Sequence, residues 1–581
     1  MIKKLARSIR EYKKPTIITI LFMTFEAIIE TIIPFITANL VNQIKEGLDV
    51  DKIVWTGVLL IVMAIVSLLC AAIAGVNAAK ASTGFGKNLR KDMFDQIQKF
   101  SFENIDKFSN ASLVTRLTVD VAYVRMSFMM IIRTAVRSPL MFCFSIIMSF
   151  IMGGMLAVSY VVVVPILVIG LLWVAKKAMP AFRRVFKKYD NLNESIEENV
   201  RGMRVVKGFS KEEYEKQKFA DASDDIMKDF TKAERIVAFN QPLMNICMYI
   251  NMVAVLVIGA MLSVKYGGTK IDVGHISSML VYSMQLLMSL MMLSMIYVML
   301  TMSAESAKRI CEVLDEEPGL KNPEAPVYEV KDGSIDFKGV SFKYSKKAEV
   351  NALSDVDLHI DSGMTVGILG GTGSSKTTLV QLIPRLYDVT EGELFVGGIN
   401  VKNYDIESLR DAVSMVLQKN LLFSGTINEN LRWGNINATQ EEIIEACKLA
   451  QADEFISTFP NGYETHIEQG GTNVSGGQKQ RLCIARALLK KPKILILDDS
   501  TSAVDMKTDA LIREGFKKYI PETTKIIIAQ RVASVMDADL IIILDDGKIV
   551  DMGKHEELLA TSTIYKEVYE QQTNGGDDHD E

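Results

Sequence analysis

The chain has 581 residues, too many for a single hydrophobic core, so at least two domains are expected. It carries 65 lysines and arginines against 70 aspartates and glutamates, and this net charge of −5 gives no reason to expect a nucleic acid partner. The composition changes along the chain, because residues 1–302 hold long apolar runs whereas residues 327–570 have the composition of a soluble α/β protein.

Residues 1–14 alternate apolar and basic positions, which predicts an amphipathic helix on the inner membrane surface. Six mostly apolar segments follow, and about 20 such residues are needed to cross a bilayer. These segments are approximately 16–40, 53–76, 138–152, 156–174, 241–264 and 276–302. We therefore expect a transmembrane domain of six helices over residues 15–310.

Basic residues crowd the N-terminus and the connections 77–137 and 175–240, whereas the shorter connections carry few. The positive-inside rule then predicts a multi-pass plasma-membrane protein with both termini and both long connections in the cytoplasm. The long connections keep a helical periodicity, so they are expected to extend the spans into the cytosol as continuous helices.

Two features lie inside the predicted spans. Glu26 and Glu30 are four residues apart on one face of the first span, near mid-bilayer. They predict either a polar cavity that favours cationic cargo or a protonated or hydrogen-bonded pair between helices. The sixth span carries a methionine stripe that fits helix packing or a flexible surface for apolar ligands. The stripe consists of Met284, Met288, Met291, Met295, Met299 and Met302.

After a linker at 311–332, alternating strands and helices predict an α/β P-loop nucleotide-binding domain over residues 333–570, and an acidic tail follows at 571–581. A buried strand leads into a loop close to the pattern G-x-x-x-x-G-K-[ST], whose backbone N–H groups bind phosphates. The loop comprises Gly370, Gly371, Thr372, Gly373, Ser374, Ser375, Lys376, Thr377 and Thr378. Lys376 is expected to reach the terminal phosphates and Thr377 to ligate Mg²⁺, although Ser375 replaces an expected glycine.

Two further motifs follow in order. Ser475, Gly476, Gly477 and Gln478 open a predicted helix about 100 residues after the phosphate loop. Asp498 ends the apolar run at 494–497, so it is expected at the end of a buried strand as a second Mg²⁺ ligand. Together these motifs resemble the ATP-binding-cassette (ABC) transporter family, and the six spans before one nucleotide-binding domain resemble an exporter half-transporter.

The resemblance implies roles for further residues. Tyr344 matches the aromatic side chain that stacks on adenine, and Gln418 matches the loop glutamine that contacts Mg²⁺. The Ser475–Gln478 motif matches the signature that binds the γ-phosphate of the ATP held by the other subunit, and Asp505 matches the loop that crosses to the partner's site. The cofactors implied are ATP and Mg²⁺, and the Mg²⁺ ligands implied are Thr377, Gln418 and Asp498.

Two catalytic positions depart from the family pattern. Asp499 stands where a glutamate usually activates water, and Gln530 stands where a switch histidine is usual. The shorter side chain withdraws the carboxylate by roughly 1.5 Å, and a misplacement of about 1 Å can cost about 10²-fold in rate. Glutamine supplies neither the charge nor the proton transfer of histidine. Both changes favour the degenerate-site subunit of a bacterial heterodimeric multidrug-type exporter, whose partner would carry the glutamate and histidine.

Three segments resemble the family's coupling elements. Residues 109–120 and 202–209 are similar to the tips of the two cytoplasmic loops, and residues 303–310 are similar to the link between the two domains. The expected function is ATP-driven export of amphipathic small molecules, lipids or peptides. The alternatives are a slow homodimeric exporter and an ATP-binding regulatory or sensor subunit in the membrane.

Overall fold

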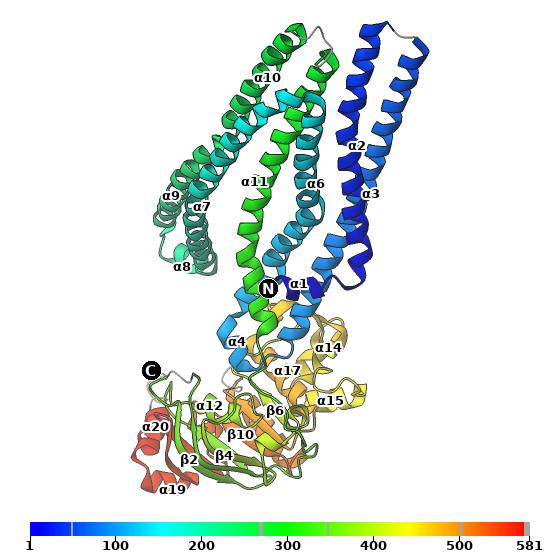
Figure 1. Cartoon of the computed structure of the whole chain (residues 1–581). Coiled ribbons are helices and arrows are strands. Elements are labelled where there is room, and N and C mark those ends of the chain that lie inside the picture. The colour runs from blue at the N-terminus through cyan, green and yellow to red at the C-terminus, as the bar shows by residue number, and fades with distance from the viewer. Residues whose placement is uncertain (48–49, 266–270, 346–347, 500–503, 575–581) are drawn as a thin grey trace. The chain divides into compact units, whose positions relative to one another are not determined.

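The computed structural model describes the chain except for residues 48–49, 266–270, 346–347, 500–503 and 575–581 (Figure 1). Its contacts divide the chain into two compact units. The helical unit contains residues 1–99 and 109–316, and the α/β unit contains residues 100–108 and 317–581.

The helical unit is built from long helices that the predicted spans occupy. Its elements are α1 (Ile2–Arg7), η1 (Arg10–Tyr12), α2 (Lys13–Glu46), α3 (Val50–Ile97), α5 (Asn110–Thr115), η2 (Arg116–Asp120), α6 (Val121–Gly153), η3 (Gly154–Ala157), α7 (Val158–Arg201), α8 (Met203–Gly208), α9 (Glu212–Ala238), α10 (Asn240–Lys265) and α11 (Val273–Asp315). Helix α11 continues past residue 310, where the transmembrane domain was expected to end.

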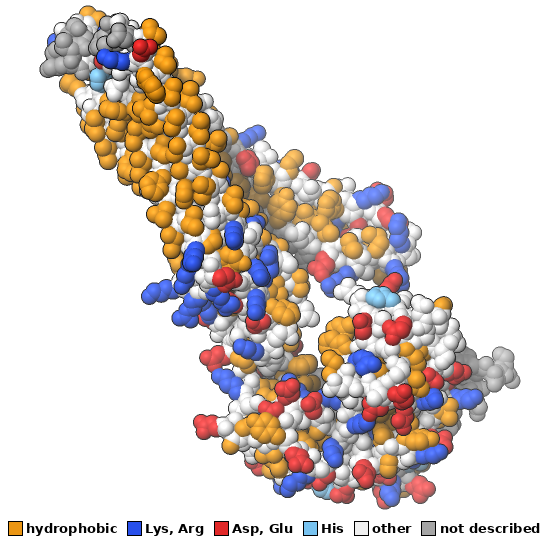
Figure 2. Space-filling model, turned by 90° about the vertical axis from the view of Figure 1, so that its right-hand side faces the viewer, with side chains coloured by type: hydrophobic (Ala, Val, Ile, Leu, Met, Phe, Trp, Pro, Cys, Tyr) orange, Lys and Arg blue, Asp and Glu red, His pale blue; other side chains and the backbone are white. Residues whose placement is uncertain are grey.

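Five helical stretches of the described residues are long and apolar enough to cross a membrane. One of them runs from Asn110 to Phe182 and includes both the third and the fourth predicted spans. Within it the chain turns at Gly154, whose φ of 46° suits glycine, and α6 and α7 lead away from that turn in different directions (Figure 1). The count of six separate spans stays a prediction. Figure 2 shows a broad apolar surface on this unit, with lysines and arginines gathered beyond one end of it.

The first 14 residues form two short helices, α1 and η1, and the start of α2, where one amphipathic helix was expected. Asn88 Nδ2 on α3 donates a hydrogen bond to the Ser8 carbonyl oxygen (3.0 Å), and the Ser8 hydroxyl donates to Asp92 (2.7 Å). These bonds hold the N-terminal segment against α3.

The Glu26–Glu30 pair is neutralised in part by an arginine on another helix. Glu26 is buried, and its carboxylate lies 3.4 Å from Nε of Arg137 on α6, while Glu30 accepts a 2.5 Å bond from Nη2 of the same arginine. This arrangement is an interhelical ion cluster, which favours the structural alternative over a pair of free anions. Sequence reasoning missed Arg137, although it directly precedes the third predicted span.

The methionine stripe on α11 is largely exposed on the single chain, since Met284, Met288, Met295 and Met302 are between 38% and 58% accessible. Packing within this chain therefore does not explain it. The stripe is available to lipid, to cargo or to another subunit.

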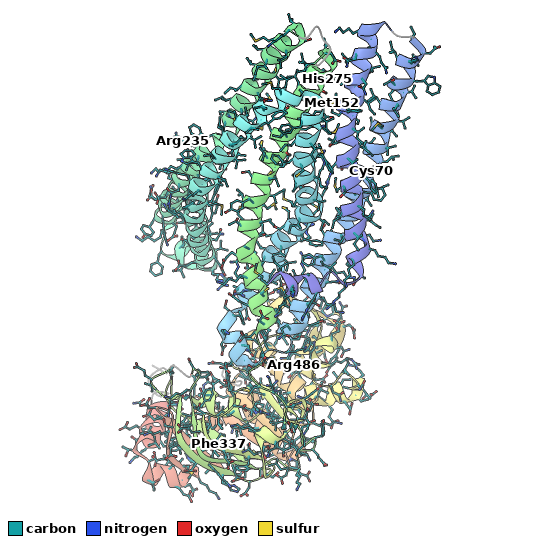
Figure 3. The ribbon with its side chains drawn as sticks, viewed as in Figure 1. Cys70, Met152, Arg235, His275, Phe337 and Arg486 are labelled. Atoms are coloured by element: carbon teal, nitrogen blue, oxygen red, sulfur yellow. The ribbon has the colours of Figure 1, made fainter. Side chains whose placement is uncertain are left out.

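The α/β unit contains two main sheets. Its longer strands are β1 (Ile335–Phe342), β2 (Leu353–Ile360), β3 (Thr365–Leu369), β4 (Glu391–Val396), β6 (Val413–Val416), β9 (Ile494–Asp498), β10 (Thr524–Ile528), β11 (Leu540–Asp545) and β12 (Lys548–Gly553), with short strands β5 (Ile399–Asn400), β7 (Gly425–Thr426) and β8 (His466–Ile467). Strands β2, β1, β4 and β5 form an antiparallel sheet, and the six-stranded sheet has the order β12-β11-β3-β10-β9-β6. Phe337 of β1 lies in the core shared by these sheets (Figure 3).

The helices of this unit pack around the sheets. They are α4 (Phe102–Phe108), α12 (Lys376–Leu382), α13 (Ile406–Ala412), α14 (Ile427–Leu431), α15 (Gln440–Leu449), α16 (Asp453–Thr458), α17 (Gly476–Leu488), α18 (Met506–Tyr519), α19 (His555–Thr561) and α20 (Thr563–Asn574). Helix α20 extends into the expected acidic tail, so residues 571–574 are helical.

The central strands β9 and β10 are mostly apolar and fully buried, as strands covered on both faces of a parallel sheet are. Their polar residues are Asp498 at the end of β9 and Thr524 and Lys525 at the start of β10. Ile528 is in register with Asp498 on one side and with Ile368 on the other. The carboxyl ends of β3, β9 and β10 therefore meet at one edge, where parallel α/β sheets bind ligands.

Helix α4 is grouped with the α/β unit although it belongs to the first long connection between apolar helices. Asp106 of α4 accepts a 2.8 Å hydrogen bond from the Tyr387 hydroxyl, and the rings of Phe102 and Tyr387 are 5.9 Å apart. The segment 109–120, which resembles a coupling element, is grouped with the helical unit, and its coupling role stays a prediction. There Arg116 and the buried Asp120 hydrogen-bond to α11 near Arg309.

Candidate nucleotide-binding site

The phosphate loop connects β3 to α12 at the sheet edge just described. Gly370 has a φ of 155°, and a Cβ there would clash with the Leu544 carbonyl oxygen and with the Ser374 hydroxyl. The Ser374 hydroxyl donates to the Gly371 carbonyl oxygen (2.9 Å), which closes the turn. The loop then leads into α12. The first N–H groups of a helix have no acceptor within it and can bind an anion at its N-terminus.

Lys376 is folded back onto this loop. Its Nζ donates to the carbonyl oxygens of Gly370 (2.8 Å) and Gly371 (2.7 Å) and to the Ser374 hydroxyl (3.2 Å). Burial lowers the pKa of Lys376, and the charges of Asp498 and Asp499 oppose that shift. The ammonium group is thus held over the loop, at the place where terminal phosphates would bind.

Ser375 occupies the position where the motif has glycine. Its φ and ψ of 70° and 24° lie in the left-handed region, which costs a residue with a Cβ on the order of 1–2 kcal/mol. The substitution is therefore accommodated in the loop conformation that glycine would adopt, with some backbone strain.

Asp498 ends β9 and is buried beside the phosphate loop. The Thr377 hydroxyl donates to its Oδ1 (3.1 Å), so the two expected Mg²⁺ ligands are adjacent. Burial raises the pKa of Asp498, and the charge of Asp499 raises it further, against the lowering by Thr377 and Lys376. Hard oxygen donors of this kind fit Mg²⁺, and a bound cation would stabilise the ionised carboxylate.

Asp499 and Gln530 lie next to each other. The Gln530 amide donates to Asp499 Oδ2 at 2.7 Å, and the Gln418 amide approaches the same oxygen at 3.4 Å. The backbone of Asp499 is also held, because its N–H donates to the Ile528 carbonyl oxygen and its own carbonyl accepts from Gln480. The carboxylate that would activate water thus faces two amide donors, and neither amide can exchange a proton with it at neutral pH.

Tyr344 is half-exposed next to the start of α12, and its hydroxyl forms a 2.8 Å hydrogen bond with Thr378. Its ring packs edge-on against Tyr387, with centroids 5.3 Å apart. A chain of contacts therefore runs from Asp106 through Tyr387 and Tyr344 to Thr378, next to the expected Mg²⁺ ligand Thr377. Sequence reasoning missed Tyr387, because nothing local marks a tyrosine that follows a helix as a contact for α4.

The signature motif begins α17. Ser475 is its N-cap, and Ser475 and Gln478 form a reciprocal capping box. Ser475 and Gly476 are exposed. In the described part of the chain, the Ser475 hydroxyl accepts from the Gln478 N–H, and the Gln478 side-chain oxygen accepts from the Ser475 N–H. This helix N-terminus is therefore exposed on the chain.

Asp505 caps α18 by accepting a 3.0 Å hydrogen bond from the Thr508 N–H, and such bonds lower the pKa of Asp505. Residues 500–503, which precede it, lie outside the described residues. The structure thus brings together the phosphate loop, Asp498, Asp499, Gln418 and Gln530, with Tyr344 beside them and the signature apart.

A phosphate loop and a buried acidic strand end in one domain, joined to a second domain of long apolar helices, define a membrane ATPase. Known protein families agree with this class. Residues 16–290 match the model of the ABC transporter transmembrane region, and residues 353–502 match the ABC transporter model.

Curated relatives cover nearly the whole chain. An uncharacterized ABC transporter ATP-binding protein, YfiB, of Bacillus subtilis (strain 168) is 37% identical over 558 residues, which is 96% of each chain. A fatty acid ABC transporter ATP-binding/permease protein of Mycobacterium bovis is 33% identical over 477 residues, or 82% of this chain and 75% of that protein. The solved structure of a bacterial Atm1-family ABC exporter with ATP bound has a TM-score of 0.83 at 23% identity and covers 97% of this chain and 98% of that one.

The chain belongs to the ABC transporter family. It joins one membrane domain and one ATP-binding domain, and its fold is similar to that of an Atm1-family exporter. Its ATP-binding domain is an ATPase coupled to transport.

Proposed function

We propose that this half-transporter carries the degenerate ATP site of a heterodimeric exporter. The observation that supports the proposal is the contact between the Gln530 amide and the Asp499 carboxylate. In phosphoryl transfer the protein must position the attacking water and stabilise charge. Here the shorter acid is already paired with an amide, so the site holds ATP and hydrolyses it slowly.

The partner is a second half-transporter that carries glutamate and histidine at the two corresponding positions. The outward-facing Ser475–Gln478 helix N-terminus of this chain would complete the partner's competent site. In this chain's own site, Mg²⁺ would be held by Thr377, Gln418 and Asp498, and the cation would neutralise phosphate charge.

The cargo is amphipathic, of the small-molecule, lipid or peptide class, and crosses the plasma membrane. The exposed methionine stripe on α11 supports an apolar contact surface that adapts to varied molecules. One relative is named as a fatty acid transporter, and fatty acids are amphipathic molecules of this class. We further propose six spans, with α6 and α7 as the third and fourth, and both termini in the cytoplasm.

The test is the identity of the nucleotide that each subunit retains. The complex purified with its partner would be incubated with a photoreactive ATP analogue labelled on the α-phosphate, crosslinked, and separated into subunits. This chain should retain the triphosphate, and the partner should carry the diphosphate. Diphosphate on this chain after a short incubation would overturn the proposal.

Two further outcomes identify the alternatives. Slow but measurable ATPase activity of this chain expressed alone would favour the slow homodimer. A complex that hydrolyses ATP in vesicles but moves neither lipids, peptides nor dyes would favour the regulatory subunit.

A further inference from the structure

Gln572 of the C-terminal helix α20 forms two hydrogen bonds with the backbone of the segment that contains Gln530. Its Nε2 donates to the carbonyl oxygen of Gln530 (2.9 Å), and its Oε1 accepts from the N–H of Val532 (2.8 Å). One side-chain amide therefore binds the C=O of one residue and the N–H of the residue two positions later. In a parallel sheet, one residue of a neighbouring strand bonds to the same two groups. The Gln572 amide therefore takes the place of a neighbouring strand for the residues that follow β10.

These bonds satisfy backbone groups at the point where the sheet ends. β10 stops at Ile528, and the following Ala529 N–H still donates to the Ile368 carbonyl oxygen. From Arg531 onward the segment closes on itself through the Ser534 N–H to the Arg531 carbonyl oxygen. Gln572 supplies the partners in between, for the exposed Gln530 carbonyl oxygen and for the N–H of the buried Val532.

Helix α20 is firmly placed to do this. Tyr565 is almost fully buried in the same hydrophobic core as Val532 and Leu558, and its hydroxyl forms a 2.6 Å hydrogen bond with Nδ1 of His555. The Ser562 hydroxyl, at the start of the helix, donates to Asp551 of β12 (2.6 Å). The helix is thus fixed at its first turn and along its apolar face, and Gln572 projects from its last turn.

We infer that Gln572 is a positioning residue of the nucleotide site, which fixes the backbone around Gln530 so that its amide stays on Asp499. Gln530 takes part in both contacts, because its carbonyl oxygen accepts a hydrogen bond from Gln572 while its side chain donates one to Asp499. This inference rests on the proposed function for its consequence, because holding that amide in place keeps hydrolysis at the site slow. It makes the C-terminal helix part of the site, although its end was expected to be an acidic tail.

The experiment measures hydrogen exchange of the full complex by mass spectrometry, in peptides that cover residues 530–535. In Gln572→Ala, exchange in this segment should become on the order of tenfold faster, as loss of about one net hydrogen bond per group implies. Gln571→Ala is the matched control, because Gln571 is the exposed neighbour on the same helix. Gln572→Glu keeps the acceptor for the Val532 N–H but loses the donor, so it should give an intermediate rate.

The functional readout is the half-time of ATP release from this chain, followed by a chase with unlabelled ATP and crosslinking of the remaining photoreactive analogue at intervals. It should shorten several-fold in Gln572→Ala and not in Gln571→Ala. Unchanged exchange in 530–535, or faster exchange spread equally over α19 and α20, would overturn the inference. Diphosphate on the unmodified chain would overturn the proposed function alone, because the exchange experiment would still test the Gln572 hydrogen bonds.

Discussion

Two parts of the ATP-binding domain that face nucleotide have diverged differently. The Ser475–Gln478 helix start matches the family signature at every position and is well capped. The corner formed by Asp499 and Gln530 departs at both catalytic positions. Under the proposed function, the chain retains what it contributes to another subunit's ATP and has lost what it needs to hydrolyse its own.

The strongest test of this contrast is Ser475→Arg. The bulky charged side chain would remove the cap and crowd the N–H groups that meet the γ-phosphate at the partner's site. Loss of such donors costs about 10²–10³-fold in rate, so steady-state ATPase activity of the complex should fall by about 10²-fold. Ser457→Arg, on the exposed surface of α16, is the control. Activity above one third of the unmodified complex would refute the assignment.

A smaller effect is expected where α4 meets the ATP-binding domain. Burial raises the pKa of Tyr387, so its hydroxyl stays protonated and donates to Asp106. Tyr387→Phe keeps the ring and removes a hydrogen bond to a charged group, worth about 1.5–3 kcal/mol. Stimulation of ATPase activity by cargo should fall by roughly fivefold or more, while ATP binding persists.

The control for that substitution is Tyr519→Phe, which removes a hydroxyl from an exposed tyrosine of α18. Equal stimulation in Tyr387→Phe and in the unmodified complex would show that α4 does not transmit the cargo signal. The earlier expectation placed that role in residues 109–120, so the same assay on Val114→Asp, an exposed position there, separates the two segments.

The opposite half of the contrast is tested by Asp499→Asn. The substitution preserves shape and removes the charge at a corner where little hydrolysis is expected. Overall ATPase activity should change by less than about twofold, because the rate-determining chemistry proceeds at the partner's site. A loss approaching that of Ser475→Arg would mean that both sites turn over at similar rates.

The sequence was sufficient for the residues whose role follows from local order. The phosphate loop, Asp498 and Asp499 occupy strand ends whose apolar runs mark them, and the parallel register brings those ends together. The missed residues act across long separations. Arg137 is 107 residues from Glu30, Tyr387 is 281 from Asp106, and Gln572 is 42 from Gln530. Tertiary packing sets these pairs, and no local sequence pattern predicts them.

The helical unit shows the same limit. The lengths of its helices follow from apolar runs and from the absence of breakers, but the pairing of Glu26 and Glu30 with an arginine depends on which helix packs beside α2. The four-residue spacing of the two glutamates predicts that they share a helix face, but it does not predict which helix or side chain packs against that face.

The smallest predicted effect concerns the phosphate loop, where Ser375 is strained. Ser375→Gly relieves a left-handed conformation that costs about 1–2 kcal/mol. It also increases the entropy of the unfolded chain, which offsets about 0.5–1 kcal/mol. The net stabilisation should be below about 1 kcal/mol, seen as a rise of a few degrees in the thermal unfolding midpoint of the nucleotide-free complex. Ser375→Ala keeps the Cβ and should give no rise, so an equal gain in both variants would place the effect in the hydroxyl and not in the backbone.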